Sequence, residues 1–346
     1  MLRGAARDPT GERVINPIYG RVINCGMRNR SRLIVTLTLA FAVSTFAQNG
    51  PQAQPEPSAA VDALLLPFHG KVSYYAHDLS TGQTMELNAD QPVPTASVIK
   101  LTILYTALEQ IRAGKAHFND PIVLHKEDQV PGSGVLLFFD TPVTFTLKDV
   151  LTMMIAESDN TATNLAIDDL GLKTIDDQIV ALGMKNTWLY KKVYQPAVGT
   201  MPADQPQFGL GKTTAREMGE LMERLVTCNL SSAPIGAAAS SSANASDQQL
   251  CNTAVHMLKV QFFRNSIPRY LEKLDTTEGD SAIANKTGAL DHVRNDVGAV
   301  TTKHGTIILS LFTHDNADTS WTPDNDAEVL MAKIAQAIVK AWVPGS

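Results

Sequence analysis

The last third of the sequence changes its hydrophobic period, and this change constrains the fold more than any other feature. Residues 281–286, 296–302 and 306–313 are alternating or continuously apolar, with glycine or polar turns between them, which predicts three consecutive β-strands. A helical pattern follows over about residues 326–342. Consecutive strands joined by short turns favour an antiparallel sheet, and we expect helices to pack on its faces.

The preceding sequence completes the architecture. Residues 71–76 and 84–87 are predicted to be two strands around the turn at 80–83, and these strands could join the edge of the sheet. The middle of the chain has helical periodicity instead. Helices are predicted at about 58–66, 98–112, 147–155, 161–170, 213–226 and 251–263. We therefore predict an α+β fold with two lobes, an antiparallel five-stranded sheet flanked by helices and an all-helical lobe.

The N-terminal segment has the order of a secretory signal peptide. A basic run containing Arg28, Arg30 and Arg32 precedes an apolar stretch at 33–46, and Ala47 offers a cleavage site. We predict that residues 1–47 are an upstream extension and signal peptide, with Met27 a candidate start, and that the protein is periplasmic or secreted. The alternative is a membrane anchor, for which the apolar run is short.

The remaining chain is long enough for one catalytic domain or two closely packed lobes. We expect a flexible leader at 48–57 and a catalytic domain at 58–346. The 346-residue chain has a formal net charge of −6, and its discarded N-terminus is basic. An acidic surface argues against nucleic acid and anionic membranes as partners. We expect a monomer that binds a small molecule.

Two cysteines, Cys228 and Cys251, remain after cleavage, whereas Cys25 is lost with the signal peptide. An even number of cysteines in an exported protein predicts one disulfide bond, with a pair of buried thiols as the alternative. The intervening insert at 229–250 is rich in serine and alanine and cannot build a core of its own.

The strongest chemical feature is Ser97-Val98-Ile99-Lys100 at the start of an apolar helix. Residues three apart lie on one helical face, so the Lys100 amine can reach the Ser97 hydroxyl. Burial lowers the pKa of a lysine and lets it act as a base, while a helix N-terminus favours negative charge on the serine. The alternative for this motif alone is a helix cap followed by a solvated lysine.

Two further motifs follow in order. Ser158-Asp159-Asn160 comes directly after an apolar helix, and Lys286-Thr287-Gly288 ends a predicted strand. Each tripeptide alone is common as a helix cap or a strand end. The three motifs in this order, each in a fitting structural context, are specific.

With these motifs the sequence resembles the penicillin-recognising serine enzymes, and class A β-lactamases in particular. The resemblance runs from about residue 71 to the C-terminus, and residues 158–164, 213–218 and 286–289 strengthen it. It implies a serine hydrolase that opens β-lactam rings through an acyl-enzyme on Ser97. It also implies that Lys100 takes part in proton transfer and that Ser158 passes a proton to the leaving nitrogen.

The resemblance also implies a set of substrate-binding residues and needs no metal or cofactor. Asn160 would hold the amide side chain of the substrate, and the backbone N–H groups of Ser97 and Ala289 would form an oxyanion hole. Arg294 would support binding of the substrate carboxylate, although it could equally be a surface arginine at a strand end. The complete set is Asn160, Lys286, Thr287, Gly288, Ala289 and Arg294.

One departure from the family pattern bears on turnover. Class A enzymes carry a glutamate after the Ser-Asp-Asn motif that positions the deacylating water, but residues 188–196 contain no acid. Lys212 also lies close to where the family has an aspartate. Glu157 and Asp204 are possible substitutes for the missing acid. Two alternatives therefore stay open: a D-Ala-D-Ala peptidase or esterase, and a penicillin-binding sensor that acylates without turnover.

Other motifs carry less information. Residues 209–213 resemble the end of a phosphate-binding loop but lack its first glycine and a preceding strand. Gly132-Ser133-Gly134 is too short for a nucleophile elbow. His256 and His292 lack metal-ligand spacing and are predicted to be ordinary polar residues.

Overall fold

The computed structural model describes residues 57–230, 234, 244–275 and 282–343. These residues all belong to a compact unit that spans 53–346. The predicted signal peptide at 1–47 and nearly all of the leader at 48–57 lie outside the described residues. Within the described part of the chain, no helix is both long and apolar enough to cross a membrane.

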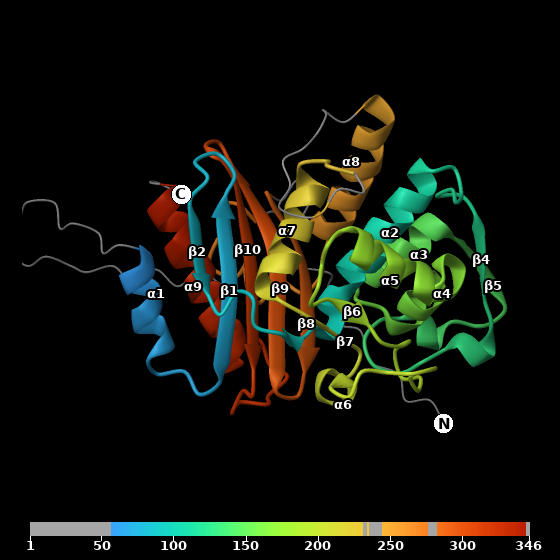
Figure 1. The fold of residues 1–346 in the computed structure, drawn as a ribbon, viewed down its shortest axis with the longest axis horizontal. Helices are drawn as coiled ribbons and strands as arrows, with labels where there is room; N and C mark the ends of the chain where they lie inside the picture. The colour runs from blue at the N-terminus through green and yellow to red at the C-terminus, as the bar shows by residue number, and fades with distance from the viewer. Residues whose placement is uncertain (1–56, 231–233, 235–243, 276–281, 344–346) are drawn as a thin grey trace, which may run out of the picture. The chain divides into compact units, whose positions relative to one another are not determined.

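A five-stranded antiparallel sheet forms one lobe, as predicted (Figure 1). Its order is β2-β1-β10-β9-β8, so the first two strands of the chain pair with the last strand and extend its edge. The strands are β1 (Lys71–Asp78), β2 (Thr84–Leu87), β8 (Ile283–Leu290), β9 (Val293–Thr302) and β10 (Gly305–His314). Four of them, all except β2, are longer than the apolar pattern indicates, and in β8 and β9 this is because backbone pairing continues through Thr287, Gly288 and Arg294.

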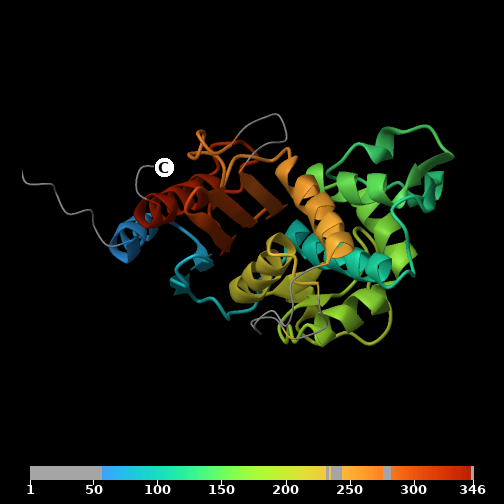
Figure 2. The ribbon, with the colours of Figure 1, turned by 90° about the horizontal axis from the view of Figure 1, so that it is seen from above.

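Helices cover both faces of the sheet. On one face, α9 (Asp326–Trp342) packs on β9 and β10, and α1 (Pro57–Leu65) packs on α9. The other face carries α7 (Ala215–Val226), which contacts β1, β9 and β10 (Figure 2). Apolar side chains of the sheet fill both layers, so Ile307 and Leu309 pack toward α9 while Ile308 packs toward the helical lobe.

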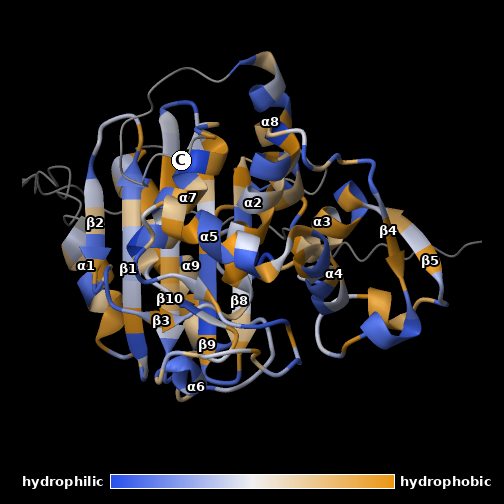
Figure 3. Ribbon diagram, turned by 45° about the vertical axis from the view of Figure 1, so that its right-hand side comes forward, coloured by the Kyte–Doolittle hydropathy of each residue, from blue (hydrophilic) through white to orange (hydrophobic). Residues whose placement is uncertain are grey.

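The helical lobe is built around α2 (Lys100–Arg112), whose residues from Lys100 to Leu108 are all buried. It contacts α3 (Leu147–Ala156), α4 (Asn160–Leu170), α5 (Leu172–Ala181), α7 and α8 (Ala245–Lys259). The apolar residues of these helices appear orange in Figure 3. A helix apolar around its whole circumference belongs in a core, as the sequence predicted for α2.

Several short elements were not predicted. The sheet β3-β7-β6 consists of β3 (Val93–Pro94), β7 (Gly211–Thr213) and β6 (Trp188–Leu189). The hairpin β4-β5 consists of β4 (Pro121–Leu124) and β5 (Val143–Thr146). Short helical turns complete the set: η1 (Ala96–Ile99), η2 (Lys126–Asp128), η3 (Leu136–Phe138) and α6 (Gln205–Phe208).

Some predicted helix boundaries were wrong. The helix expected at 251–263 is α8, which begins inside the insert at Ala245 because the Asn244 side chain accepts a hydrogen bond from the Asp247 N–H. Helix α1 begins at Pro57 and ends at Leu65, one residue earlier at each end than predicted. The predicted disulfide between Cys228 and Cys251 is present, with the two Cα atoms 5.5 Å apart, and it joins the end of α7 to α8.

Candidate active site

Ser97 lies in η1, a single 3₁₀ turn that runs directly into α2. Ala96, just before it, has a φ of 42°, a strained value for a residue with a side chain. Strands hold this turn in place from two sides. The Asn295 side chain on β9 donates to the carbonyl oxygens of Pro94 and Thr95 at 2.9 and 3.1 Å, and the Thr95 N–H donates to Gly211 on β7.

Strand β8 approaches the same turn closely because position 288 is glycine. A Cβ atom there would lie 2.9 Å from the Ser97 backbone nitrogen, 2.9 Å from the Thr95 carbonyl oxygen and 3.0 Å from the Val98 nitrogen. No larger residue fits without moving backbone. The contact brings the N–H of Ser97 beside the strand segment that carries Thr287 and Ala289.

Lys100 opens α2 and is completely buried. Its Nζ donates to the Ser158 carbonyl oxygen at 2.6 Å, the Ser158 Oγ at 3.1 Å and the Asn160 Oδ1 at 3.3 Å. Burial lowers the pKa of this amine well below its ordinary value, and the nearby Lys286 charge lowers it further. Asp159 opposes this shift in part.

The Ser-Asp-Asn motif forms a bend between α3 and α4. Ser158 has a φ of 54°, and the buried Asp159 carboxylate accepts from the Ala162 N–H to cap α4. The second carboxylate oxygen accepts from the N–H groups of Val135 and Leu136, at 2.7 and 2.8 Å. Asp159 thus holds the bend, and the side chains before and after it point toward Lys100.

Lys286, on β8, approaches the bend from the sheet. Its fully buried Nζ donates to the Ser158 Oγ at 3.0 Å and to the Thr287 carbonyl oxygen at 2.8 Å. Burial lowers the pKa of Lys286 to about 7, against the attraction of Asp296. The Ser158 hydroxyl therefore lies between two buried amines that can exchange protons through it.

Asp296, on β9, raises the pKa of Lys286 by its charge and was not singled out from the sequence. It is fully buried, which raises its pKa, and it accepts hydrogen bonds from Ser266 Oγ, the Ile267 N–H and Asn285 Nδ2. An acid two residues after Arg294 in an apolar strand was the available signal.

The structure therefore brings most of the predicted residues together. Hydrogen bonds join Lys100, Ser158, Asn160 and Lys286, while Gly288 places β8 against the backbone of Ser97. Thr287 and Ala289 flank Gly288 on the strand. Their roles toward a substrate stay predictions.

Arg294 is not joined to this cluster by any hydrogen bond of the described residues. Its guanidinium donates to the carbonyl oxygens of Leu290, Val293 and Ser320. It also stacks on Trp321 and lies 3.4 Å from a Glu328 carboxylate oxygen. Arg294 is only 2% exposed, so it is not the surface arginine considered as an alternative.

The segment without an acid lies beside the bend. Asn164 accepts from the Val193 N–H at 2.8 Å and donates to its carbonyl oxygen at 3.0 Å. Lys212 forms an ion pair with Asp204 at 2.7 Å. One of the two acids that could replace the missing glutamate is therefore already paired with a lysine. The other, Glu157, has a pKa raised by burial and by Asp159.

The loop of Gly132-Ser133-Gly134 packs against the bend at Ser158. Ser133 Oγ donates to the Ser158 carbonyl oxygen at 2.7 Å, and the Ser133 carbonyl oxygen accepts from the Asn160 N–H at 3.0 Å. Rejecting the tripeptide as a nucleophile elbow was sound, but the pair of glycines was a signal of close packing.

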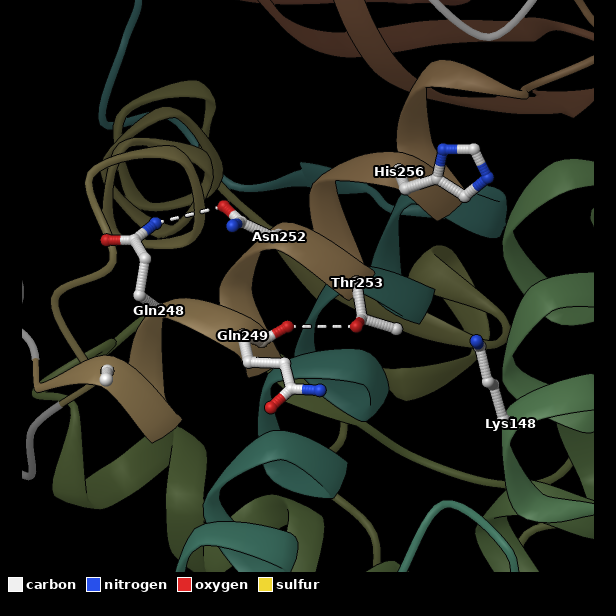
Figure 4. Close-up of a pocket in the computed structure, with 7 residues that line it drawn as sticks. Lys148, Gln248, Gln249, Asn252, Thr253 and His256 are labelled. Atoms are coloured by element: carbon white, nitrogen blue, oxygen red, sulfur yellow. Dashed lines mark hydrogen bonds between the residues drawn. The ribbon is translucent and has the colours of Figure 1, made fainter.

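A groove of about 500 Å³ on the surface of α8 lies away from these residues (Figure 4). It is lined mainly by polar side chains, of which Gln248 donates to Asn252 at 3.0 Å. His256 is among its lining residues. Among the described residues, no group of three metal-ligating side chains is present.

Comparison with known proteins identifies a family. The model of the beta-lactamase enzyme family matches residues 56–342. The solved β-lactamase of Sphaerobacter thermophilus is 30% identical, with a TM-score of 0.67, and covers 82% of this chain and 96% of its own. A curated β-lactamase of Streptomyces fradiae is 26% identical over 337 residues, covering 90% of this chain and 96% of its own. A curated protein of Streptomyces cacaoi, named β-lactamase regulatory protein BlaB, is 22% identical over 299 residues, covering 77% of this chain and 91% of its own.

Proposed function

Because the chain belongs to the beta-lactamase enzyme family, as the sequence resemblance indicated, we propose that it opens β-lactam rings through an acyl-enzyme on Ser97. One observation carries this proposal. The Ser158 hydroxyl lies 3.1 Å from the Lys100 amine and 3.0 Å from the Lys286 amine, and all three groups are buried. This arrangement suits transfer of a proton to a leaving nitrogen.

The acylation step uses these groups in turn. Lys100, neutral because its pKa is lowered, takes the proton of the Ser97 hydroxyl as the oxygen bonds to the β-lactam carbonyl carbon. The carbon–nitrogen bond of the ring then breaks. The nitrogen takes the proton of the Ser158 hydroxyl, and Ser158 recovers a proton from Lys100. The product is an ester of Ser97 with the ring-opened substrate.

Binding groups surround the reacting atoms in this proposal. The N–H groups of Ser97 and Ala289 stabilise the oxyanion, supported by the close approach of β8 at Gly288. Lys286 and Thr287 bind the substrate carboxylate. Asn160 Nδ2 donates one hydrogen to the Pro131 carbonyl oxygen at 3.0 Å, which leaves its second hydrogen for a substrate amide.

We further propose that hydrolysis of the acyl-enzyme is slower than its formation. Asn164, on α4, exchanges hydrogen bonds with the backbone of Val193, in the segment that contains no acid. Asp168 and Asp204 are each in an ion pair with a lysine, Lys192 and Lys212 respectively. A slow second step also suits a sensor or a D-Ala-D-Ala peptidase, and the name of the Streptomyces cacaoi relative is a regulatory one.

We also propose that the protein is exported. A disulfide between Cys228 and Cys251 is typical of an oxidising compartment, which supports a periplasmic or secreted location.

Stopped-flow mixing with a chromogenic cephalosporin tests the proposal. We expect a burst of ring opening equal to one equivalent of enzyme, followed by slower turnover, and a mass increase on Ser97. Ser97→Ala should show neither the burst nor the mass increase. Ser80→Ala, which removes a hydroxyl bonded to Asp78 in a surface turn, is the matched control and should behave as the unmodified protein. Covalent labelling that persists in Ser97→Ala would exclude Ser97 as the nucleophile.

A further inference from the structure

We infer that Ser133 is a positioning residue that tunes the proton affinity of Lys100 by sharing its main acceptor, the carbonyl oxygen of Ser158. This inference rests on the proposed function, in which Lys100 must be neutral to accept the proton of Ser97. Nothing in the sequence motifs assigns a role to Ser133.

Two donors converge on one oxygen. The Ser158 carbonyl accepts from the Lys100 amine at 2.6 Å and from the Ser133 hydroxyl at 2.7 Å. A carbonyl oxygen has two lone pairs, so both are used. The single hydroxyl proton of Ser133 is committed to this bond, because the contact of the same oxygen with Asn160 Oδ1 is longer, at 3.5 Å.

The loop that carries Ser133 is built to hold it there. Gly132 and Gly134 both have positive φ, at 92° and 104°. A Cβ on Gly132 would lie 2.5 Å from Asn160 Nδ2, and one on Gly134 would lie 2.2 Å from the Asp159 carboxyl carbon. Hydrogen bonds from the Asn160 N–H and to Asp159 then fix the loop on the bend. Ser133 is half-buried, and the close packing of the glycines before and after it fixes its position.

The electrostatic consequence has a definite sign. A hydroxyl that donates to the Ser158 carbonyl weakens that oxygen as an acceptor for the Lys100 ammonium, so it favours the neutral amine. The charged groups facing Lys100 are Lys286 from β8, which acts in the same direction, and Asp159 from the start of α4, which opposes it. Removing the hydroxyl should therefore raise the pKa of Lys100.

The test is the pH profile of the acylation rate for Ser133→Ala, measured by covalent labelling with a fluorescent penicillin. If acylation needs neutral Lys100, the acylation rate falls on the acid side of its pH profile, where Lys100 becomes protonated. We expect this acid limb to move to higher pH in Ser133→Ala, by about half a unit or more. The acylation rate should therefore fall several-fold at the low pH values of the limb and change little at higher pH. Ser133→Thr keeps a hydroxyl and should restore the original limb.

Two outcomes would overturn the inference. The acid limb of Ser133→Ala could superimpose on that of the unmodified protein, or the rate could fall by the same factor at every pH, as expected from a loosened loop alone. The failure of the proposed function is distinguishable, because the unmodified protein would then not be labelled at all.

Discussion

Lys286 is a fully buried amine that donates to the Ser158 hydroxyl and the Thr287 carbonyl oxygen, and its burial has a cost for folding. Its pKa is about 7 in the folded protein, whereas an exposed lysine titrates near 10.4. Between these values the unfolded chain binds more protons at this residue than the folded chain does. The free energy of unfolding therefore rises with pH across this window.

We predict that Lys286→Met stabilises the protein near neutral pH. The variant removes the cost of burying an amine that is fully protonated in the unfolded chain, so its free energy of unfolding should exceed that of the unmodified protein by at least about 1 kcal/mol at about pH 7. The gain should shrink as the pH approaches about 10.5. Urea denaturation at both pH values measures it. Lys303→Met, an exposed position in the β9–β10 turn, is the control, and an equal gain at both pH values would contradict the argument.

At the scale of elements, the disulfide joins α7 to α8 across an insert with little apolar content. In the chain-entropy model, a bond that closes a loop of this length stabilises by about 3 kcal/mol, by restricting the unfolded chain. We predict that dithiothreitol lowers the free energy of unfolding by roughly this amount. Cys228→Ala/Cys251→Ala should be insensitive to the reductant. The measurement is urea unfolding with and without it, and equal stability in both conditions for the unmodified protein would refute the prediction.

The elements that sequence reasoning predicted best have a strong period between clear boundaries. Helix α9 and strand β2 have the predicted bounds, because α9 has an apolar stripe and a cap at Asn325 while β2 alternates between turns. Helix α5 was not predicted, because Thr174, the two aspartates and the β-branched residues in it favour a helix weakly and it begins directly after Gly171, where α4 ends. In the site, the three motifs predicted the cluster of Lys100, Ser158 and Lys286.

The contacts of Ser133 and Asp296 could not be predicted from the sequence, which indicated only close packing at two glycines and an acid in an apolar strand. Each acts through tertiary contacts between segments distant in the chain, one to the bend at Ser158 and one to Ser266 beneath the sheet. The hydrophobic periodicity of a segment does not indicate such a contact. The strand position of Arg294 and the partners of its guanidinium were not predicted either, because the apolar pattern indicates a strand only from 296.

At the scale of the whole molecule, the site depends on how closely the sheet lobe meets the helical lobe. Strand β8 brings Lys286 to the bend, and it also contacts η1, where Ser97 lies. The glycine at 288 sets that approach, because the atoms that a Cβ would meet are backbone atoms of Thr95, Ser97 and Val98. Strands hold this backbone on two sides, so it cannot move away from an added Cβ atom as a flexible side chain can.

We predict that Gly288→Ala separates reactivity from folding. The added methyl must push β8 from η1, which we expect to cost about 1–3 kcal/mol of stability and to lower the acylation rate at least about 100-fold, since a small misplacement of reacting groups is enough. Urea unfolding and penicillin labelling measure the two effects on one sample. Gly114→Ala is the control, because a Cβ there meets no atom within 4 Å, although φ at Gly114 is positive, at 67°, unlike φ at Gly288. Labelling of Gly288→Ala at the original rate would show that the lobes do not need this close approach for acylation.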